Sequence, residues 1–394
     1  MNAKERKAAE FLKGERLCCA LVRAVACACI AVILATAAHS VEGDTARFYQ
    51  AVYRDGVLYT GAPDGRFVAV GVQLRQVQWT FQDTKLDGFL KPAVTDEGVF
   101  LLAGRPDSEA TEAIALDRSK GRILWRQPFG KAGRSSSPVT CGGNLILVDR
   151  ETGRVIALDA KSGKKQWDSG RQPYFYFNPP AIEGGNLYFI YREKAEDLSG
   201  GVAVLNCADG KLLRTIHVEG IGTSECPIIL RNGAAILTNR VYDAPSQMML
   251  LDLRMGNINW RITIPPRYIP GSCPAIVDDH MVCGSGGLWV LDLETGRTLA
   301  SHEIDESTSD TVVYAHSIVF MAGSRSLAAF RIEPFARIWK TRFSSALTSN
   351  VVPCDDALCV QTQSGKLAVL DARSGKVRGY VPLLENQPTT SGIR

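Results

Sequence analysis

Five aspartates recur at one spacing, and an aspartate carboxylate can act as a general base or ligate a hard cation. Each follows two apolar residues and stands four residues before a glycine. This pattern is also typical of a tight turn, because the carboxylate accepts turn N–H groups and glycine adopts positive φ. A residue that recurs once per repeat serves the scaffold, so we predict no catalytic residue among them. The five are Asp117, Asp159, Asp252, Asp292 and Asp371.

The histidines and glycines give no cofactor site by spacing. His217, His280, His302 and His316 stand singly, without the close second ligand of a local metal motif, although a site assembled from distant segments stays open. The stretch Gly284-Ser-Gly-Gly287 connects two strand-like segments instead of opening a helix, so a hairpin turn is favoured over a phosphate-binding loop. We therefore predict no metal and no cofactor.

The segments that position these residues repeat along the chain. The stretch Ala157-Leu-Asp-Ala-Lys-Ser-Gly-Lys-Lys-Gln-Trp167 returns, in full or degenerate form, eight times at spacings of 39 to 47 residues. Self-similarity at this period indicates a propeller or a solenoid. The positions equivalent to Trp167 are 79, 125, 167, 214, 260, 300, 339 and 379.

Each repeat has the composition of four short strands. Apolar and polar residues alternate before the Asp-x-x-x-Gly turn, and a second hairpin signal such as Gly184-Gly185 or Asn232-Gly233 lies upstream. Four antiparallel strands in about 40 residues make a propeller blade. We predict an all-β, eight-bladed antiparallel β-propeller over residues 46–384. Its last outer strand comes from residues 376–384, or alternatively from residues 46–50.

The repeat resembles the quinoprotein-like (PQQ-like) propeller family, whose blades carry Ala-x-Asp-x-x-x-Gly-x-x-x-Trp, and the resemblance covers nearly all of residues 46–384. Eight copies and this length are most similar to the BamB-type propellers of the outer-membrane β-barrel assembly machinery. The resemblance implies a non-enzymatic scaffold that recognises an envelope protein or peptide. One fold hosts many functions, so the repeat is specific for the fold and weak for the function.

The alternative is a quinone- or small-ligand-binding propeller, either an enzyme like the PQQ-dependent dehydrogenases or a sensor. Those enzymes resemble one another in a disulfide between adjacent cysteines, a bound calcium and long insertions over the ring. Here the one adjacent pair, Cys18-Cys19, lies in the leader, and blades use nearly all the remaining residues. We therefore expect that the protein is not an enzyme.

The N-terminal segment is typical of an export signal. Residues 17–38 are apolar apart from Arg23, but the uninterrupted part, residues 24–37, is shorter than the ~20 residues of a spanning helix. The segment ends in small residues, Ala35-Thr36-Ala37, so we favour a cleaved signal peptide and a periplasmic propeller. An uncleaved anchor in the inner membrane is the alternative. The expected segments are 1–38 leader, 39–45 linker, 46–384 propeller and 385–394 tail.

Seven of the eleven cysteines follow the leader, and an odd number in an exported domain leaves at least one without an intrachain partner. Cys354 and Cys359 would lie diagonally across a two-residue turn, so a bridge between them stays open. Cys273 and Cys283 would point to opposite faces. We expect the others to be small buried apolar residues. These are Cys141, Cys207 and Cys226.

The charge balance argues against a nucleic-acid partner. The chain carries a formal net charge of +4, and the leader holds six basic and three acidic residues. Little excess remains for the propeller, and we find no basic stripe of the kind that nucleic-acid binding needs. We expect a monomeric propeller that binds a protein or peptide.

The segments that break the repeat predict the binding face. Extra residues fall between the second and third strands of blades 2, 4 and 5, at 105–112, 192–198 and 240–246. Together with the connections 171–177 and 265–270, these segments should share one face of an up-and-down propeller. Aromatic and arginine side chains concentrate binding energy at interfaces. The predicted protein-binding residues are Arg171, Tyr174, Tyr176, Arg267 and Tyr268.

Overall fold

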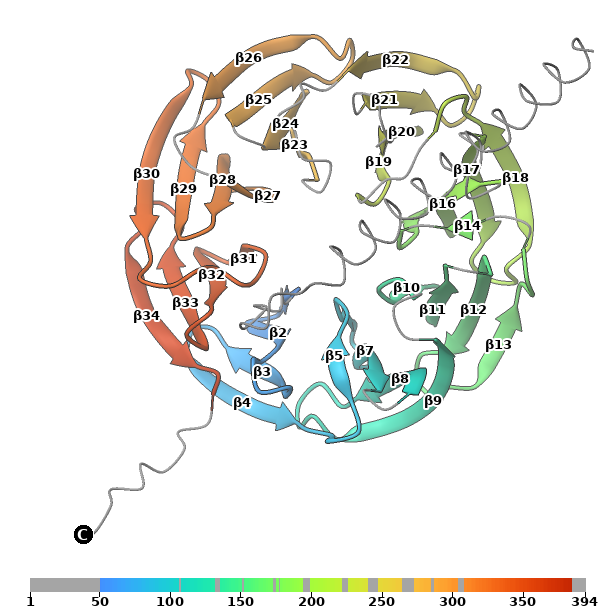
Figure 1. Cartoon of the computed structure of the whole chain (residues 1–394), viewed down its shortest axis with the longest axis horizontal. Coiled ribbons are helices and arrows are strands. Elements are labelled where there is room, and N and C mark those ends of the chain that lie inside the picture. Colours follow the sequence, from blue (N-terminus) through green and yellow to red (C-terminus); the bar gives the residue numbers. More distant parts are fainter. Residues whose placement is uncertain are drawn as a thin grey trace, which may run out of the picture. The chain divides into compact units, whose positions relative to one another are not determined.

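Eight antiparallel sheets follow one another around a ring, and each runs from the central channel to the rim (Figure 1). The computed structural model describes residues 50–105, 108–131, 135–150, 152–172, 175–176, 178–193, 199–221, 226–239, 247–263, 273–284, 287–303 and 308–384. Each sheet uses consecutive strands, with the first on the channel side and the last on the rim. The predicted eight-bladed propeller is therefore confirmed.

The first four blades differ in the number of their strands. Blades 2 and 4 each contain a short additional strand on the channel side, which pairs with the loop-side end of the blade's long inner strand. Their strands are β1 (Val52–Arg54), β2 (Val57–Gly61), β3 (Phe67–Gly71) and β4 (Gln76–Phe81); β5 (Asp87–Phe89), β6 (Ala93–Val94), β7 (Val99–Arg105), β8 (Ser108–Leu116) and β9 (Ile123–Lys131); β10 (Val139–Cys141), β11 (Asn144–Asp149), β12 (Arg154–Asp159) and β13 (Lys165–Asp168); and β14 (Phe175–Tyr176), β15 (Ala181–Glu183), β16 (Asn186–Arg192), β17 (Gly200–Asn206) and β18 (Leu212–His217).

The last four blades have four strands each in the described part of the chain, paired in sequence order. Their strands are β19 (Ile229–Arg231), β20 (Ala234–Asn239), β21 (Gln247–Asp252) and β22 (Ile258–Thr263); β23 (Ala275–Val277), β24 (His280–Gly284), β25 (Gly287–Asp292) and β26 (Thr298–Glu303); β27 (Thr308–Ala315), β28 (Ile318–Gly323), β29 (Ser326–Arg331) and β30 (Ala336–Arg342); and β31 (Val352–Cys354), β32 (Ala357–Thr362), β33 (Lys366–Asp371) and β34 (Val377–Pro382).

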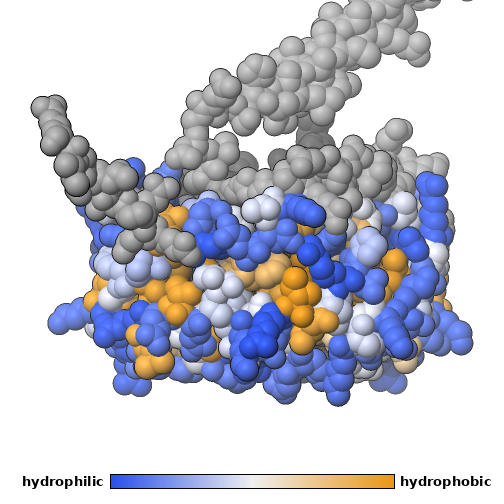
Figure 2. Space-filling view, turned by 90° about the horizontal axis from the view of Figure 1, so that it is seen from below, coloured by the Kyte–Doolittle hydropathy of each residue, from blue (hydrophilic) through white to orange (hydrophobic). Residues whose placement is uncertain are grey.

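The repeat positions fall in one register in every blade. Ala157 of β12 pairs with Trp167 of β13, and all seven equivalent pairs occur at the predicted positions. One β-bulge lies just before the Trp position in each blade, so one residue of the outer strand is left unpaired. Large exposed apolar residues occupy this bulge in four blades. They are Leu124, Leu213, Leu299 and Ile338. Figure 2 shows that apolar patches lie among charged side chains on the side of the ring.

Tryptophan and glycine make a repeated joint between neighbouring blades. Trp125 donates its indole N–H to the Ala160 carbonyl of the next blade at 2.9 Å, and its ring lies against Gly163. Gly163 has φ +68°, and an added Cβ would lie 2.6 Å from the indole. Trp79, Trp167, Trp260 and Trp339 make the same hydrogen bond, and Gly121, Gly210, Gly296 and Gly375 lie against them.

Three joints depart from this pattern, and in each of them another side chain occupies the space between the blades. At blades 4 and 5 the guanidinium of Arg214 takes the place of the indole and donates to the Leu253 carbonyl. At blades 6 and 7 the sizes are exchanged, because Ala300 stands at the Trp position and Phe335 at the glycine position. Phe335 stacks on His302 there.

The ring closes between blades 8 and 1, where the large and the small residue of the joint are again exchanged between the two blades. Gly379 stands at the Trp position, and Arg75 at the glycine position fills the space and donates to the Arg378 carbonyl. Buried polar contacts cross the same seam. Gln361 donates to Thr60 Oγ1 at 2.6 Å and to the carbonyl of Gly61 at 3.0 Å.

The outer strand of the last blade is β34, which favours residues 376–384 over residues 46–50 for this role. Chain order is thus kept in every blade. The N-terminal end of the propeller is held by side-chain contacts instead of a shared sheet. Ala51 exchanges two hydrogen bonds with the Asn350 amide, and the buried Arg66 donates to the Leu383 carbonyl at 2.7 Å.

Two sequence expectations are wrong. Residue 105 and residues 108–112 lie in strands and not in a loop, because β7 ends at Arg105 and β8 begins at Ser108, and these two residues pair. Cys141 and Cys207 are not isolated apolar residues but form a disulfide. They are 66 residues apart, yet the end of β10 in blade 3 meets the turn after β17 in blade 4. Cys354 and Cys359 are buried and reduced.

Candidate partner-binding face

The two faces of the propeller have different constructions. One face carries the turns between the first and second and between the third and fourth strands of each blade, and we name it the turn face. The other carries the connections between the second and third strands and between blades, and we name it the loop face. The hairpin of β7 and β8 extends the loop face in blade 2, where the sequence pattern placed an insertion.

The aspartates of the turn face act as predicted for a scaffold. Asp159 accepts the backbone N–H and the hydroxyl of Ser162 at 2.7 and 2.6 Å, and these bonds lower the pKa of its carboxyl. Asp371 accepts the same two groups from Ser374 and also pairs with Arg378 at 2.6 Å. The Arg378 guanidinium, followed by the Ser374 hydroxyl and N–H, holds the pKa of Asp371 well below its usual range. These carboxylates are occupied in holding turns.

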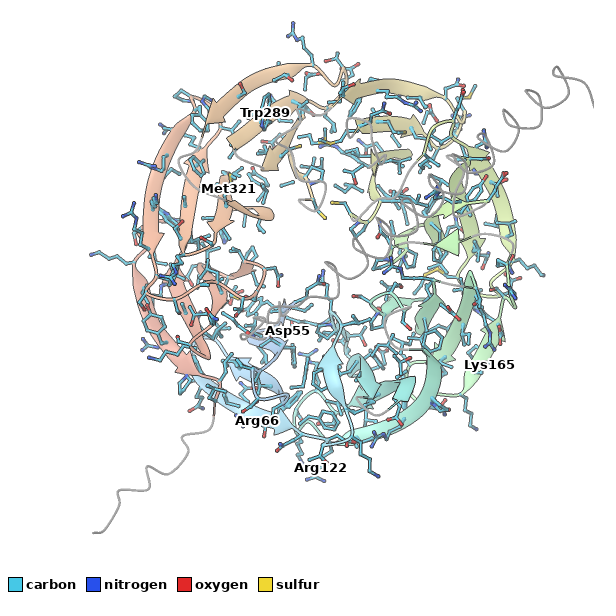
Figure 3. The ribbon with its side chains drawn as sticks, viewed as in Figure 1. Asp55, Arg66, Arg122, Lys165, Trp289 and Met321 are labelled. Atoms are coloured by element: carbon cyan, nitrogen blue, oxygen red, sulfur yellow. A yellow bond between two sulfur atoms is a disulfide. The ribbon has the colours of Figure 1, made fainter. Side chains whose placement is uncertain are left out.

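A charged network joins the first two blades on the channel side of the turn face. Arg118 pairs with Asp55 at 2.7 Å and with Asp96 at 3.2 Å, and Arg54 pairs with Asp96 at 2.8 Å. Figure 3 shows Asp55 at the inner edge of the ring. The network connects turns of neighbouring blades, and both carboxylates pair with a guanidinium.

Of the predicted protein-binding residues, Arg171 has a described side chain. It is exposed and lies three residues beyond Asp168, the last residue of β13. Tyr176 lies in β14, where its backbone pairs with Tyr191 of β16, but its side chain lies outside the described part. The remaining three also lie outside the described residues. They are Tyr174, Arg267 and Tyr268.

The chain on either side of Arg171 is fixed by short contacts. Asp168 accepts two bonds from the Arg154 guanidinium, at 3.0 and 2.5 Å, and one from the Gly170 N–H at 3.0 Å. The Arg154 bonds, followed by the Gly170 N–H, hold the pKa of Asp168 well below its usual range. Gln172 binds the carbonyls of Thr152 and Ser169. Arg171 is therefore presented from an anchored corner of blade 3.

Blade 4 buries a charge where the sequence suggested an exposed loop. Arg192 ends β16 and is buried, and its backbone pairs with Phe175 of β14 and Gly200 of β17. Beyond it, the Glu193 N–H donates to the Ser199 carbonyl and closes the base of the next segment. The apolar run before Arg192 continues the strand, which is the signal that predicts burial.

Blade 2 carries a second charged cluster that the sequence reasoning missed. Arg126 of β9 pairs with Glu112 of β8 at 2.5 Å and with Asp83 at 2.9 Å. The backbone N–H of Lys85 and then the Arg126 guanidinium lower the pKa of Asp83. Glu112 is buried, so the pair with Arg126 offsets the cost of removing its charge from water. The cluster stiffens the long hairpin on the loop face.

The described residues hold no cluster of three or more His, Cys, Asp or Glu side chains that could bind a metal ion. Within the same residues, no helix is long and apolar enough to cross a membrane. Cys18 and Cys19, the adjacent pair weighed as a quinone-site disulfide, lie outside the described part.

Sequence comparison decides the family. The family model described as outer membrane protein assembly factor BamB matches residues 63–299 and 239–379, which together cover most of the chain. The chain belongs to the BamB family. A curated BamB of Alkalilimnicola ehrlichii is 30% identical over 96 residues, which are 24% of this chain and 23% of that relative. The match thus spans about a quarter of the relative's length.

Solved structures share the fold with this BamB-family chain. BamB from Moraxella catarrhalis superposes with a TM-score of 0.62 at 14% identity, covering 81% of this chain and 92% of that one. A quinohemoprotein alcohol dehydrogenase from Pseudomonas putida gives a TM-score of 0.59 at 10% identity, covering 77% and 68%. At these identities the likeness is one of fold.

Proposed function

We propose that this chain is a non-enzymatic scaffold of the cell envelope that holds a protein or peptide partner in outer-membrane protein assembly. The observation that carries the proposal is the BamB family match along residues 63–379. The curated relative and one solved structure bear the same name, and the former is called an outer membrane protein assembly factor. The partner's identity rests on this family membership.

The loop face is the proposed working surface. Its segments vary in length from blade to blade, whereas the turn face repeats one capped turn whose carboxylates are already occupied. Arg171 is exposed on an anchored corner, and arginine and tyrosine are the side chains that most often carry interface energy. We place the contact on Arg171, Tyr174, Tyr176, Arg267 and Tyr268.

We place the propeller in the periplasm, after export by the N-terminal segment. The disulfide between Cys141 and Cys207 supports an oxidising compartment, since such bonds rarely persist in the cytosol. Intact-mass analysis distinguishes the two forms of the leader. A mature chain that begins near Ala38 indicates cleavage, and a retained Met1 indicates an anchor in the inner membrane.

The test is capture of partners by the tagged full chain from solubilised envelopes. A component of the outer-membrane β-barrel assembly machinery should be recovered. The triple variant Arg171→Ala, Tyr174→Ala, Tyr176→Ala should lose it. The matched control replaces two exposed residues of the turn face, Arg373 and Lys376, with alanine and should keep it. Loss of the partner in the control alone would show that the partner binds the turn face and not the loop face.

A quinone- or small-ligand-binding enzyme is the second candidate, and the fold likeness to the quinohemoprotein alcohol dehydrogenase favours it. It has its own measurement. Purified protein incubated with the quinone and calcium would gain a stoichiometric quinone absorbance and would oxidise alcohols with an artificial electron acceptor. Either result would overturn the scaffold proposal.

A further inference from the structure

A groove of about 310 Å³ lies on the rim between blades 2 and 3. Its lining is apolar at the base, where Leu147, Ile156 and Leu158 of blade 3 meet Phe129 of β9. These four side chains are buried and belong to one core cluster, so the groove lies directly over the packed interface of blades 2 and 3. Polar residues line its edges.

One residue of the repeat lies at the opening of the groove. Two residues after the Trp position, four of the eight blades place an apolar side chain, and in blades 1, 4 and 8 it packs on the next blade. Phe81, Ile216 and Val381 do so and are buried. Blade 2 has Gln127 at this position, and this partly buried residue lines the opening. Gln127 is polar and does not pack into the joint as Phe81 does, and the groove lies beside it.

Positive charge surrounds the groove. In the described parts of residues 117–172, eleven lysines and arginines stand against four aspartates. Lys165 and Arg154 line the groove itself, and their side chains are 58% and 44% exposed. Both contact Asp168, and Asp149 lies opposite Arg154 in the sheet, so Lys165 is the more available cation at the opening. Figure 3 shows Lys165 on the outer strand of blade 3.

The edge strand beside the groove is unsuited to pairing with another strand. Pro128 lies in the middle of β9, the rim strand of blade 2, and is exposed. Proline has no N–H to donate and is a residue that protects sheet edges. A ligand is therefore recognised by its side chains, which enter the groove, and not by an added β-ladder.

We propose that this groove is a second binding site, which takes a short extended segment of a partner protein with an apolar anchor flanked by carboxylates. The apolar side chain enters beside Ile156 and Leu158, and the carboxylates face Lys165 and Arg154. The site is separate from the contact proposed for the loop face. It stands on the groove alone, and it does not require that contact.

The probe is a fluorescein-labelled decapeptide with a central Leu-Phe pair flanked by aspartate and glutamate, and the full chain is titrated into it. Fluorescence anisotropy should show saturable binding that weakens between low and high salt, because the flanking contacts are ionic. Two matched peptides serve as controls. One carries lysine in place of the acids, and the other carries serine in place of the Leu-Phe pair.

Two variants locate the binding. Gln127→Phe copies Phe81 of blade 1 and fills the groove, and Lys165→Glu reverses the charge at its edge. Each should weaken binding by about tenfold or more, as expected for loss of one buried apolar group or one charge contact. Gln127→Ala keeps the groove open and should bind like the native chain. Lys211→Glu, at an exposed residue of the β17–β18 turn in blade 4, is the charge control and should also bind normally.

Several results would overturn the proposal. Equal binding of the acidic, lysine and serine peptides would show that the groove selects neither charge nor apolar character. Unchanged affinity in both Gln127→Phe and Lys165→Glu would place the probe elsewhere. Thermal melting of each variant checks the fold, and if the groove-filling change unfolds the protein, the exposed Lys165→Glu decides. Failure here leaves the loop-face capture experiment unaffected, so the two proposals are tested separately.

Discussion

Adding one methyl group at Gly163 tests whether the joint between blades depends on tryptophan packing. The residue has φ +68°, and a Cβ there would lie 2.6 to 2.9 Å from three atoms of the Trp125 ring. The indole cannot retreat easily, because Trp125 is buried and its N–H is held by the Ala160 carbonyl at 2.9 Å. Gly184→Ala is the matched control, since Gly184 has φ +57° and nothing within 4 Å of a Cβ.

The two substitutions separate backbone strain from packing. An alanine forced into the left-handed region costs about 1–2 kcal/mol at either site. Gly163→Ala adds overpacking against the indole, which costs about 1–3 kcal/mol in a well-packed core. We therefore expect the free energy of unfolding to fall by about 2–5 kcal/mol for Gly163→Ala and about 1–2 kcal/mol for Gly184→Ala.

Urea denaturation of the full chain measures both losses, provided that the m-values stay equal. Combining Gly163→Ala with Trp125→Ala supplies a further check, because removing the indole also removes the clash. In that background the methyl group at Gly163 should cost no more than the one at Gly184. Equal losses for the two single variants would refute the packing argument.

Three further predictions follow from contacts described above. Phe335→Ala should lower the free energy of unfolding by about 2 kcal/mol, which is less than the loss for a fully buried phenylalanine. Phe335→Gly should also destabilise the protein, and the double variant Phe335→Gly, Ala300→Trp should recover part of that loss in the same urea assay. Cys141→Ser should cost about 4 kcal/mol from the chain entropy of its 66-residue separation, and a reductant should then cause no further loss. Arg378 depresses the folded pKa of Asp371 and Asp356, so their stabilisation is complete above the unfolded value near 3.9 and is lost as the pH falls toward the folded values. Melting temperatures should stay level from about pH 7 to 5 and then fall, and the fall should be smaller for Arg378→Ala, whereas an equal fall would contradict this assignment.

Local signals determine most of the propeller, and these were readable in the sequence. The Asp-x-x-x-Gly turn and the two-residue hairpins fix strand ends within one blade, so the register of Ala157 with Trp167 and its equivalents was predicted correctly. The Cys141–Cys207 bond was missed because it joins positions that become neighbours after two blades have packed. Phe335 stands at the glycine position of a degenerate copy of the repeat. The large side chain is explained by Ala300 of the neighbouring blade, which is small where other blades have tryptophan.

The candidate sites were predictable to a smaller degree. Arg171 stays a prediction made from a non-repeating segment, and the structure shows that it is exposed. The burial of Arg192 requires knowing that β16 and β17 extend to it. The groove residue Gln127 had a signal in the sequence, namely a polar side chain where Phe81 and Ile216 stand in other blades. The signal can be interpreted only when the facing surface of blade 3 is known, because a polar residue on the exposed rim is otherwise ordinary.

The exchanged sizes at Ala300 and Phe335, and at Gly379 and Arg75, distinguish the joints between blades 6 and 7 and between blades 8 and 1 from the others. A duplication of blade 3 in the gene would leave every joint matched, because tryptophan would still meet glycine on both sides of the copy. A duplicated blade 7 would press tryptophan onto Phe335, and a duplicated blade 8 would set Gly379 against a glycine turn and leave a hole. Duplication of a blade is therefore compatible with matched joints at some positions and not at others. Unequal recombination at blade 7 or 8 should give a destabilised protein.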